Sequence, residues 1–267
     1  MPEFPNGALY LNLSKKEWIK AKQPPQMKAQ REASTMERDT RYPNIIKRLE
    51  TLSNPEIAKG MAWAGIKARK VYGISIPNLR KKAKETGKNH AVAQELWASG
   101  IHEARIIACM IDDHKMLTEE QMESWVKDFD SWGLCDGCCG NLFDKTTVAY
   151  QKAVEWSSRQ EEYVKRAGFV MMATLAVHDK KAKDEEFLKF LPIIKQESTD
   201  NRNYVKKAVN WALRQIGKRN TPLNKAAIET AKAIYGIDSK SARWIALDAL
   251  KELTSAAVER RLRSRKT

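Results

Sequence analysis

Hydrophobic residues recur every three or four positions along most of the chain from about residue 36 onward. One such run carries Phe169, Val170, Met172 and Leu175, a spacing that places apolar side chains on one face of a helix. Segments with the strict alternation of a half-buried strand are not found in the sequence. The pattern therefore predicts an all-α protein of about twelve helices, each of roughly 10–18 residues, joined by short loops.

Residues that begin and end helices punctuate this pattern. Thr118 precedes a first turn with Gln121 three positions on, which is typical of a capping box. Asp130 or Ser131 is expected to cap a helix that starts at Trp132. Two further starts are predicted where a hydroxyl residue precedes a proline by one or two positions, at Ser75 and Thr221.

The same pattern divides the chain into three parts. Residues 1–35 contain four prolines and few periodic apolar positions, so we expect a weakly ordered N-terminal extension. Residues 36–255 form the helical domain. Residues 256–267 form a basic C-terminal tail, which is either an arm that binds nucleic acid or the frayed end of a helix.

An internal repeat lies within the helical domain. The sequence YVKRA at residues 163–167 recurs as YVKKA at residues 204–208, an offset of 41, and a looser echo, SARW, occupies residues 241–244. Offsets near 40 between helical units match HEAT and armadillo arrays, which curve into a superhelix with a concave side. The repeated basic residues either line that concave side as a track for phosphates, or lie at helix ends as remnants of common ancestry.

Composition and charge narrow the class of protein. The chain has 267 residues, a net charge of +15 and a mean hydropathy of -0.58, and it has no apolar run that would span a membrane. Residues 1–100 and 201–267 carry net charges of +10 and +11, whereas residues 101–200 carry -6. This excess favours polyanionic partners, although a Lys-rich solvated surface is the alternative. With no secretory leader and clustered cysteines, we expect an intracellular, reduced protein.

The segment around residues 129–140 has the most unusual chemistry. On a helix starting at Trp132, Trp132 and Asp136 are four residues apart and therefore share a face. A carboxylate beside an aromatic ring suits a cationic ligand, since both attract positive charge. In the alternative interpretation, Asp136 pairs with an arginine of the next helix, such as Arg166, and Trp132 belongs to the core.

Other cofactor chemistry has little support in the sequence. Cys135, Cys138 and Cys139 lack the two separated ligand pairs of a structural zinc site, and we interpret them as small residues that allow close helix packing. Neither GxxxxGK[ST] nor GxGxxG is present, so no nucleotide cofactor is expected. We expect no metal and no organic cofactor.

Three segments together resemble the AlkD-like DNA alkylation repair family. They are residues 130–143, residues 164–169 and residues 205–215, and the similarity extends over about residues 36–255. The resemblance implies a HEAT-like, all-α superhelix whose concave basic face holds double-stranded DNA. It also implies a monofunctional glycosylase that releases N3- and N7-alkylated purines without base flipping and without strand cleavage.

The resemblance also implies functional residues. The family's two tryptophans and aspartate fall at Trp132, Trp211 and Asp136, its DNA-holding basic residue falls at Arg166, and an N-terminal aromatic falls at Trp63. Asp136 would stabilise a sugar that becomes oxocarbenium-like, and the indole faces would flank it. Further candidates for contacts with the DNA backbone are Lys206, Lys207, Arg214, Lys218, Arg219 and Arg243. The chain departs from the family at Gly133, where an acidic residue is common.

Two other functions fit the same sequence. One is a non-catalytic HEAT-repeat protein that binds damaged or branched DNA, as some relatives are expected to do. The other is a scaffold whose concave face binds an acidic protein. We expect a monomer located in the cytoplasm and associated with the nucleoid.

Overall fold

The computed structural model describes residues 41–66 and 68–264, and within them all regular secondary structure is helical. The expected N-terminal extension, residues 1–35, lies outside the described residues. The helices, in chain order, are α3 (Tyr42–Thr51), α4 (Pro55–Trp63), α5 (Ile76–Thr86), α6 (His90–Ala98), α7 (His102–Ile111), α8 (Glu119–Lys127), α9 (Trp132–Asn141), α10 (Ala149–Ser157), α11 (Glu162–His178), α12 (Asp184–Leu188), α13 (Phe190–Gln196), α14 (Asn203–Gly217), α15 (Thr221–Tyr235), α16 (Lys240–Leu253) and α17 (Ala256–Arg263), with short 3-10 turns η1 (Phe143–Lys145) and η2 (Glu197–Thr199).

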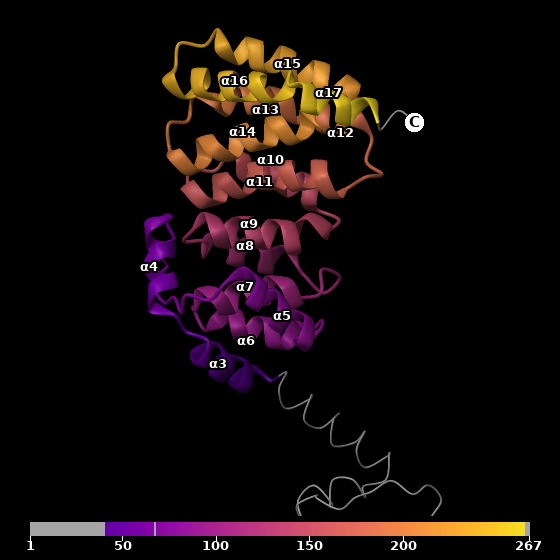
Figure 1. The fold of residues 1–267 in the computed structure, drawn as a ribbon. Coiled ribbons are helices and arrows are strands. Elements are labelled where there is room, and N and C mark those ends of the chain that lie inside the picture. The colour runs from indigo at the N-terminus through magenta and orange to yellow at the C-terminus, as the bar shows by residue number, and fades with distance from the viewer. Residues whose placement is uncertain (1–40, 67, 265–267) are drawn as a thin grey trace, which may run out of the picture.

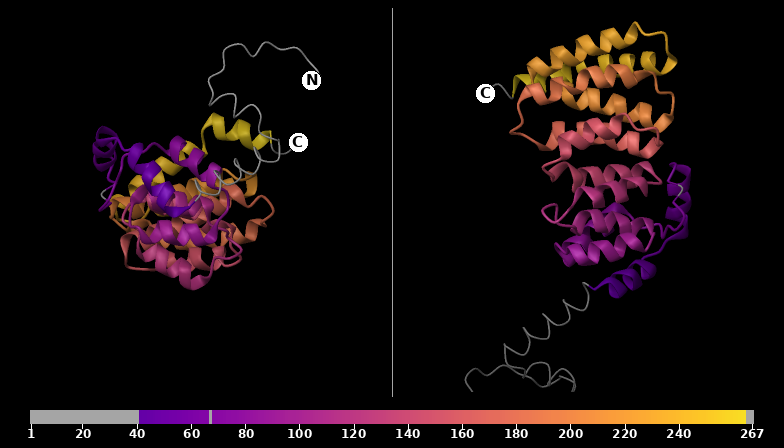
Figure 2. Two further views of the ribbon diagram at one scale, coloured as in Figure 1. Left: turned by 90° about the horizontal axis from the view of Figure 1, so that it is seen from below. Right: turned by 180° about the vertical axis from the view of Figure 1, so that it is seen from behind.

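The helices stack in antiparallel pairs along one axis (Figure 1). In one layer α7, α9, α11, α14 and α16 pack each on the next, and α6, α10 and α15 each cover their partner in that layer. The stack is continuous from α5 to α16, as the view from behind also shows (Figure 2). This arrangement confirms the all-α repeat architecture expected from the sequence.

The repeat detected in the sequence marks equivalent helices. Residues 163–167 open α11, residues 204–208 open α14 and residues 241–244 open α16. The close approach of α11 to its partner α10 depends on Gly168, because a Cβ there would lie 2.4 Å from the backbone nitrogen of Ser157. The offset near 40 therefore corresponds to one pair of helices.

Most of the predicted helix starts are present, with one shift. The Thr118 hydroxyl accepts a hydrogen bond from the backbone N–H of Gln121, and Ser131 caps α9. The cap of α15 is Asn220 rather than Thr221, because the Asn220 side chain accepts from the N–H of Leu223 and Thr221 is already the first helical residue. An asparagine carboxamide reaches this N–H as readily as a hydroxyl does.

The cysteines of α9 lie in the core between helices. Cys135, Cys138 and Cys139 are buried, and the thiols of Cys135 and Cys139 donate to the backbone carbonyls of Tyr163 and Ala167 on α11. Burial raises the pKa of the Cys138 and Cys139 thiols well above the ordinary value, which keeps them protonated. These contacts agree with the interpretation of the cysteines as small packing residues.

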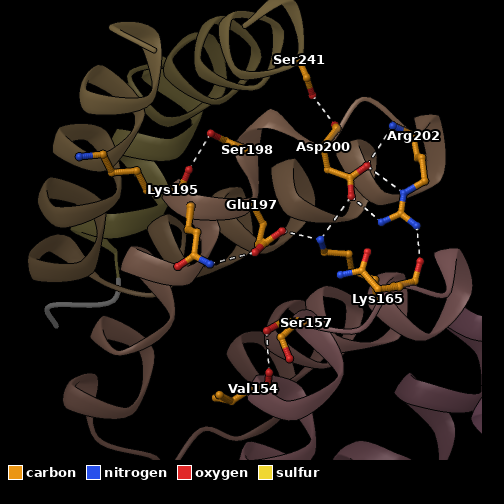
Figure 3. A network of polar contacts seen from close by, with 12 residues as sticks. Val154, Ser157, Lys165, Lys195, Glu197, Ser198, Asp200, Arg202 and Ser241 are labelled. Atoms are coloured by element: carbon orange, nitrogen blue, oxygen red, sulfur yellow. Dashed lines mark hydrogen bonds and ion pairs between the residues drawn. The ribbon is translucent and has the colours of Figure 1, made fainter. Parts of the chain in front are cut away.

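Polar contacts join the C-terminal repeats. Lys165 of α11 is buried and its Nζ lies 2.5 Å from Glu197 Oε2 and 3.4 Å from Asp200 Oδ2, as Figure 3 shows. Asp200 also accepts hydrogen bonds from Arg202, and its carbonyl accepts one from the hydroxyl of Ser241 in α16. Lys165, a basic residue of the repeat, is therefore structural.

Two helices lie at the margins of this stack. The segment expected to be a basic tail forms α17 as far as Arg263, and its Val258 and Leu262 are buried, so a helix packs there on α16. Helix α4 has no buried residue and stands across the ends of α7 and α9 (Figure 1). No helix in the described part of the chain is both long and apolar enough to cross a bilayer.

Candidate functional site

A cleft of about 670 Å³ opens where α4, α9, α11 and α14 meet. Its walls carry the two tryptophans and the aspartate singled out from the sequence, together with four of the predicted DNA-binding residues. The lining residues are Trp63, Ala64, Gly65, Trp132, Asp136, Arg166, Asn203, Tyr204, Lys207, Trp211 and Arg214. The structure thus brings together side chains that lie as far apart in the chain as Trp63 and Arg214.

Asp136 and Arg166 form a bidentate ion pair in the cleft. Arg166 Nε donates to Asp136 Oδ1 at 2.9 Å and Arg166 Nη2 donates to Asp136 Oδ2 at 2.8 Å. The Arg166 side chain is only 7% exposed and that of Asp136 is 24% exposed. Burial raises the pKa of the Asp136 carboxyl above its ordinary value, and the Arg166 guanidinium opposes that rise.

Both interpretations of Asp136 therefore describe part of the site. The carboxylate pairs with Arg166, as the structural interpretation held, and it also lines an open cleft beside an aromatic ring, as the ligand-binding interpretation held. Each carboxylate oxygen accepts one bond from Arg166 and keeps a further lone pair for a ligand. Arg166 also donates from Nη1 to the carbonyl of Tyr204 at 2.6 Å, which fixes the guanidinium to α14.

Trp132 and Trp211 stand on α9 and α14, and both are half-buried. The indole Nε1 of Trp132 donates to the backbone carbonyl of Ala64 at 2.9 Å. This bond uses the polar edge of the ring, so Trp132 meets the cleft with its apolar surface. Trp211 lies two turns along α14 from Tyr204, so the two side chains share one face of the helix.

The turn after α4 closes one side of the cleft. Tyr204 Oη donates to the carbonyl of Gly65 at 3.4 Å, and Gly65 has a φ of +87°, which only glycine adopts without strain. A Cβ at this position would lie 2.0 Å from Tyr204 Oη. We call residues 64–66 the closing turn, since Trp132 and Tyr204 both hold it against the stack.

Comparison with known proteins identifies the family of this arrangement. The family model for the DNA alkylation repair enzyme matches residues 45–253. The chain belongs to the DNA alkylation repair enzyme family. None of the curated proteins matches it. A solved structure described as "A new family of proteins related to the HEAT-like repeat DNA glycosylases with affinity for branched DNA structures" has a TM-score of 0.67, with 21% identity over 80% of this chain and 96% of that chain. The likeness confirms the HEAT-like repeat fold.

In this member of the DNA alkylation repair enzyme family, the predicted basic residues other than Arg166 fall into two groups. Arg214 and Lys218 both pair with Glu252, at 2.7 and 2.5 Å, and Arg219 donates to the carbonyls of Ala176 and Ala182. These three side chains therefore contribute to packing between repeats. Their contact with DNA remains a prediction.

The second group is free of ion pairs within the described residues. It consists of Lys206, Lys207 and Arg243, and Lys207 and Arg243 are exposed. Only Lys207 among them lines the cleft, whereas the Nζ of Lys206 lies 5.0 Å from the ring centroid of Trp244. Trp63 is 96% exposed at the rim of the cleft. These positions suit contact with a large anionic ligand more than the first group does.

Sequence reasoning missed the residues that join the walls of the cleft. In the sequence Tyr204 stands out only as part of the repeat, yet in the fold its carbonyl accepts a hydrogen bond from Arg166 and its hydroxyl donates to the closing turn. Gly65 carries no motif that would mark its positive φ. Position 133 is where the chain departs from the family pattern. A Cβ added at Gly133 would lie 3.2 Å from Ile66 Cδ1, so the glycine leaves room for the closing turn.

No group of three or more His, Cys, Asp or Glu side chains is placed to hold a metal ion in residues 41–66 and 68–264. The charged groups that line the cleft are the carboxylate of Asp136, the guanidinium groups of Arg166 and Arg214 and the ammonium of Lys207, and they lie among three indole rings. A carboxylate beside indole rings is chemically suited to stabilising positive charge, and a lysine side chain is suited to holding a phosphate.

Proposed function

We propose that this protein is a DNA glycosylase that releases cationic N3- and N7-alkylated purines from duplex DNA. The observation that carries the proposal is the convergence of Trp132, Asp136 and Trp211 on one cleft beside Lys207, which forms no ion pair with the described residues. The family match to a DNA alkylation repair enzyme supports it. The excess of positive charge suits a polyanionic substrate.

An alkylated purine of this kind already carries a positive charge and leaves without protonation by a general acid. The bond between C1′ and the purine nitrogen breaks, and its electron pair goes to the base, which leaves neutral. Asp136 stabilises the positive charge that develops on the deoxyribose, and the indole surfaces of Trp132 and Trp211 flank it. A water that Asp136 orients adds to C1′ and loses a proton to solvent, which gives an abasic site in an intact strand.

Arg166 has a positioning role in this scheme. Its two hydrogen bonds hold both carboxylate oxygens of Asp136, and its bond to the Tyr204 carbonyl holds the guanidinium itself. Three of its five N–H groups are used in these bonds, which leaves two for a phosphate near the lesion. The same guanidinium weakens the field that Asp136 exerts on a sugar, because the pair as a whole is neutral.

The decisive experiment measures release of 7-methylguanine and 3-methyladenine from methylated duplex DNA by the protein and by Asp136→Asn. Asparagine keeps one oxygen for Arg166 but loses the charge, so we expect release to fall by at least about 100-fold while DNA affinity is retained. Asp128→Asn is the matched control, since Asp128 also pairs with an arginine, Arg105, but lies outside the cleft. Full activity of Asp136→Asn would refute the mechanism.

A second candidate function is binding of branched DNA without catalysis. The observation that favours it is the neutralisation of Asp136 by Arg166, which reduces the electrostatic stabilisation available to a cationic sugar. The related family in the structural comparison is described as having affinity for branched DNA. No base release by the parent protein, together with salt-sensitive binding that is tighter for a four-way junction than for linear duplex, would establish this function instead.

A further inference from the structure

Four helices that pack one on the next in a single layer carry charged or aromatic side chains at the same position, counted from the helix start. The fifth residue of α9, α11, α14 and α16 is, in turn, Asp136, Arg166, Lys207 and Trp244. Equivalent positions of stacked repeats fall in line, because each repeat is related to the next by a small rotation and translation. We call this row the fifth-position row.

One contact, the shared cleft and one ring contact place the four members of the row near one another. Asp136 and Arg166 touch, and Lys207 lines the same cleft. Lys206, the neighbour of Lys207, lies over the ring of Trp244 at 5.0 Å. Trp244 therefore continues the row one helix beyond the cleft.

The surroundings of Trp244 are exposed and cationic. Trp244 is 40% exposed and Leu247, one turn along α16, is 53% exposed. Lys240 and Arg243 are exposed on the same helix, and within the described residues no ion pair engages Lys206, Lys240 or Arg243. The nearby carboxylate of Asp248 accepts a hydrogen bond from Asn210 at 2.6 Å, so its charge is already satisfied in part.

We propose that Trp244 is a stacking platform for an unpaired base of a DNA strand that leaves the duplex bound at the cleft. This inference rests on the proposed binding of DNA and adds a separate site for a single strand. An indole at the surface offers a ring to the face of a base, and lysine and arginine beside it hold the adjacent phosphates. Proteins that bind single strands without sequence preference combine these same two features.

The chemistry favours an unpaired base over a base pair. Bases within a duplex are covered above and below by their neighbours, so a side chain on a helix surface meets only their edges and the phosphates. A base at an overhang or a branch exposes its face. A protein partner is disfavoured because Lys206, Lys240 and Arg243, which pair with no carboxylate of the described residues, surround this small apolar surface, and a desolvated cation is costly at a protein interface.

The test compares binding of two fluorescent DNA probes, a blunt duplex and the same duplex with a thymidine overhang of about ten nucleotides. We expect the parent protein to bind the overhang probe more tightly. Trp244→Ala should lower affinity for that probe by at least about fivefold and leave affinity for the blunt duplex unchanged, since stacking is lost for the overhang alone. Trp244→Phe should keep most of the preference, because phenylalanine retains a ring.

Tyr235→Ala is the matched control, because Tyr235 is an exposed aromatic, 49% accessible, at the end of α15 rather than on α16. It should bind both probes as the parent does. Equal preference for the overhang in Trp244→Ala and the parent would overturn the proposal, as would equal losses on both probes. Base release from blunt methylated duplex, measured on the same samples, reports on the glycosylase separately, because its failure leaves the binding comparison intact.

Discussion

Asp136 is held between two opposing effects on its charge. Burial disfavours the carboxylate, whereas Arg166, which donates to both of its oxygens, favours it. A lone buried carboxylate would take up a proton, and a fully exposed one would be screened by water. The pair thus keeps an ionised group in a partly desolvated cleft, where its interaction with a cationic sugar is stronger than in water.

We predict that Arg166→Gln shifts the pH profile of base release. Glutamine retains hydrogen bonding but loses the charge that lowers the pKa of Asp136, so this pKa rises further. Because the carboxylate is active only when ionised, the acid limb of the profile should move to higher pH. The check is the rate of 7-methylguanine release between pH 4 and 9, and an unmoved acid limb would show that Arg166 does not control Asp136.

The sequence predicts which residues lie together when they share one helix. It does not predict contacts between residues that are far apart in the chain. Trp132 and Asp136 were placed together because four residues span one turn. The sequence offers pairing of Asp136 with Arg166 as one of two interpretations, and it favours that pairing on the cost of a buried unpaired charge, but it does not show that the two side chains come within reach of each other. The double role of Tyr204 depends on its backbone carbonyl and on Gly65, 139 residues away, and no local pattern reports either contact.

At the scale of elements, α4 differs from every helix of the stack. It contributes no buried residue, and near the cleft Trp132 and Tyr204 each donate a hydrogen bond to the closing turn that follows it. Elements with so few buried contacts open locally at little cost. The closing turn therefore links the position of α4 to two residues of the cleft.

We predict that Gly65→Ala loosens α4 without unfolding the protein. The new Cβ would meet Tyr204 Oη at 2.0 Å and the backbone would be strained at φ +87°, so the closing turn must move away. Hydrogen exchange should become faster in residues 55–63, and base release should fall. Gly87→Ala is the control, because Gly87 has a φ of +72° but open space around its Cβ, and equal effects of the two changes would exclude a role of the closing turn.

We predict that Asp200→Asn destabilises the junction between α11, η2 and α14. Burial raises the pKa of Asp200, but hydrogen bonds from Arg202 outweigh this and hold the pKa below its ordinary value. Folding therefore stabilises the ionised carboxylate. Unfolding free energy should fall by about 1.5–3 kcal/mol at neutral pH, a typical loss for bonds to a charged group. The difference from the parent should shrink as the pH falls through the folded pKa, where both side chains are neutral.

At the scale of the whole molecule, two features of the sequence predict the repeat organisation. Helical periodicity gave the class, and the recurrence of residues 163–167 at 204–208 gave the stacking unit. The distribution of charge was harder to foresee. The sequence shows how many lysines and arginines there are, but Glu252, which pairs with both Arg214 and Lys218, is identified as their partner only by the fold.

We predict unequal contributions of the basic residues to salt-dependent DNA binding. Lys207→Ala should reduce the slope of log affinity against log salt by about one, since a lysine that pairs with no carboxylate in residues 41–66 and 68–264 releases one counterion on contact with a phosphate. Lys218→Ala should change the slope less, because Lys218 pairs with Glu252. Fluorescence anisotropy at several salt concentrations measures both, and a larger effect of Lys218→Ala would reverse this assignment.

The fifth-position row has a consequence for how such a protein diversifies. Each helical pair brings one position to this row, so a substitution at an exposed member such as Lys207 changes the surface chemistry without disturbing the packing beneath it, whereas Arg166 is buried and bonded to Asp136 and Tyr204. Gain or loss of a terminal pair lengthens or shortens the row by one step and leaves the remaining steps in register. Proteins of this architecture are therefore expected to diverge by single substitutions at one position per helical pair. In this chain those positions hold Asp136, Arg166, Lys207 and Trp244.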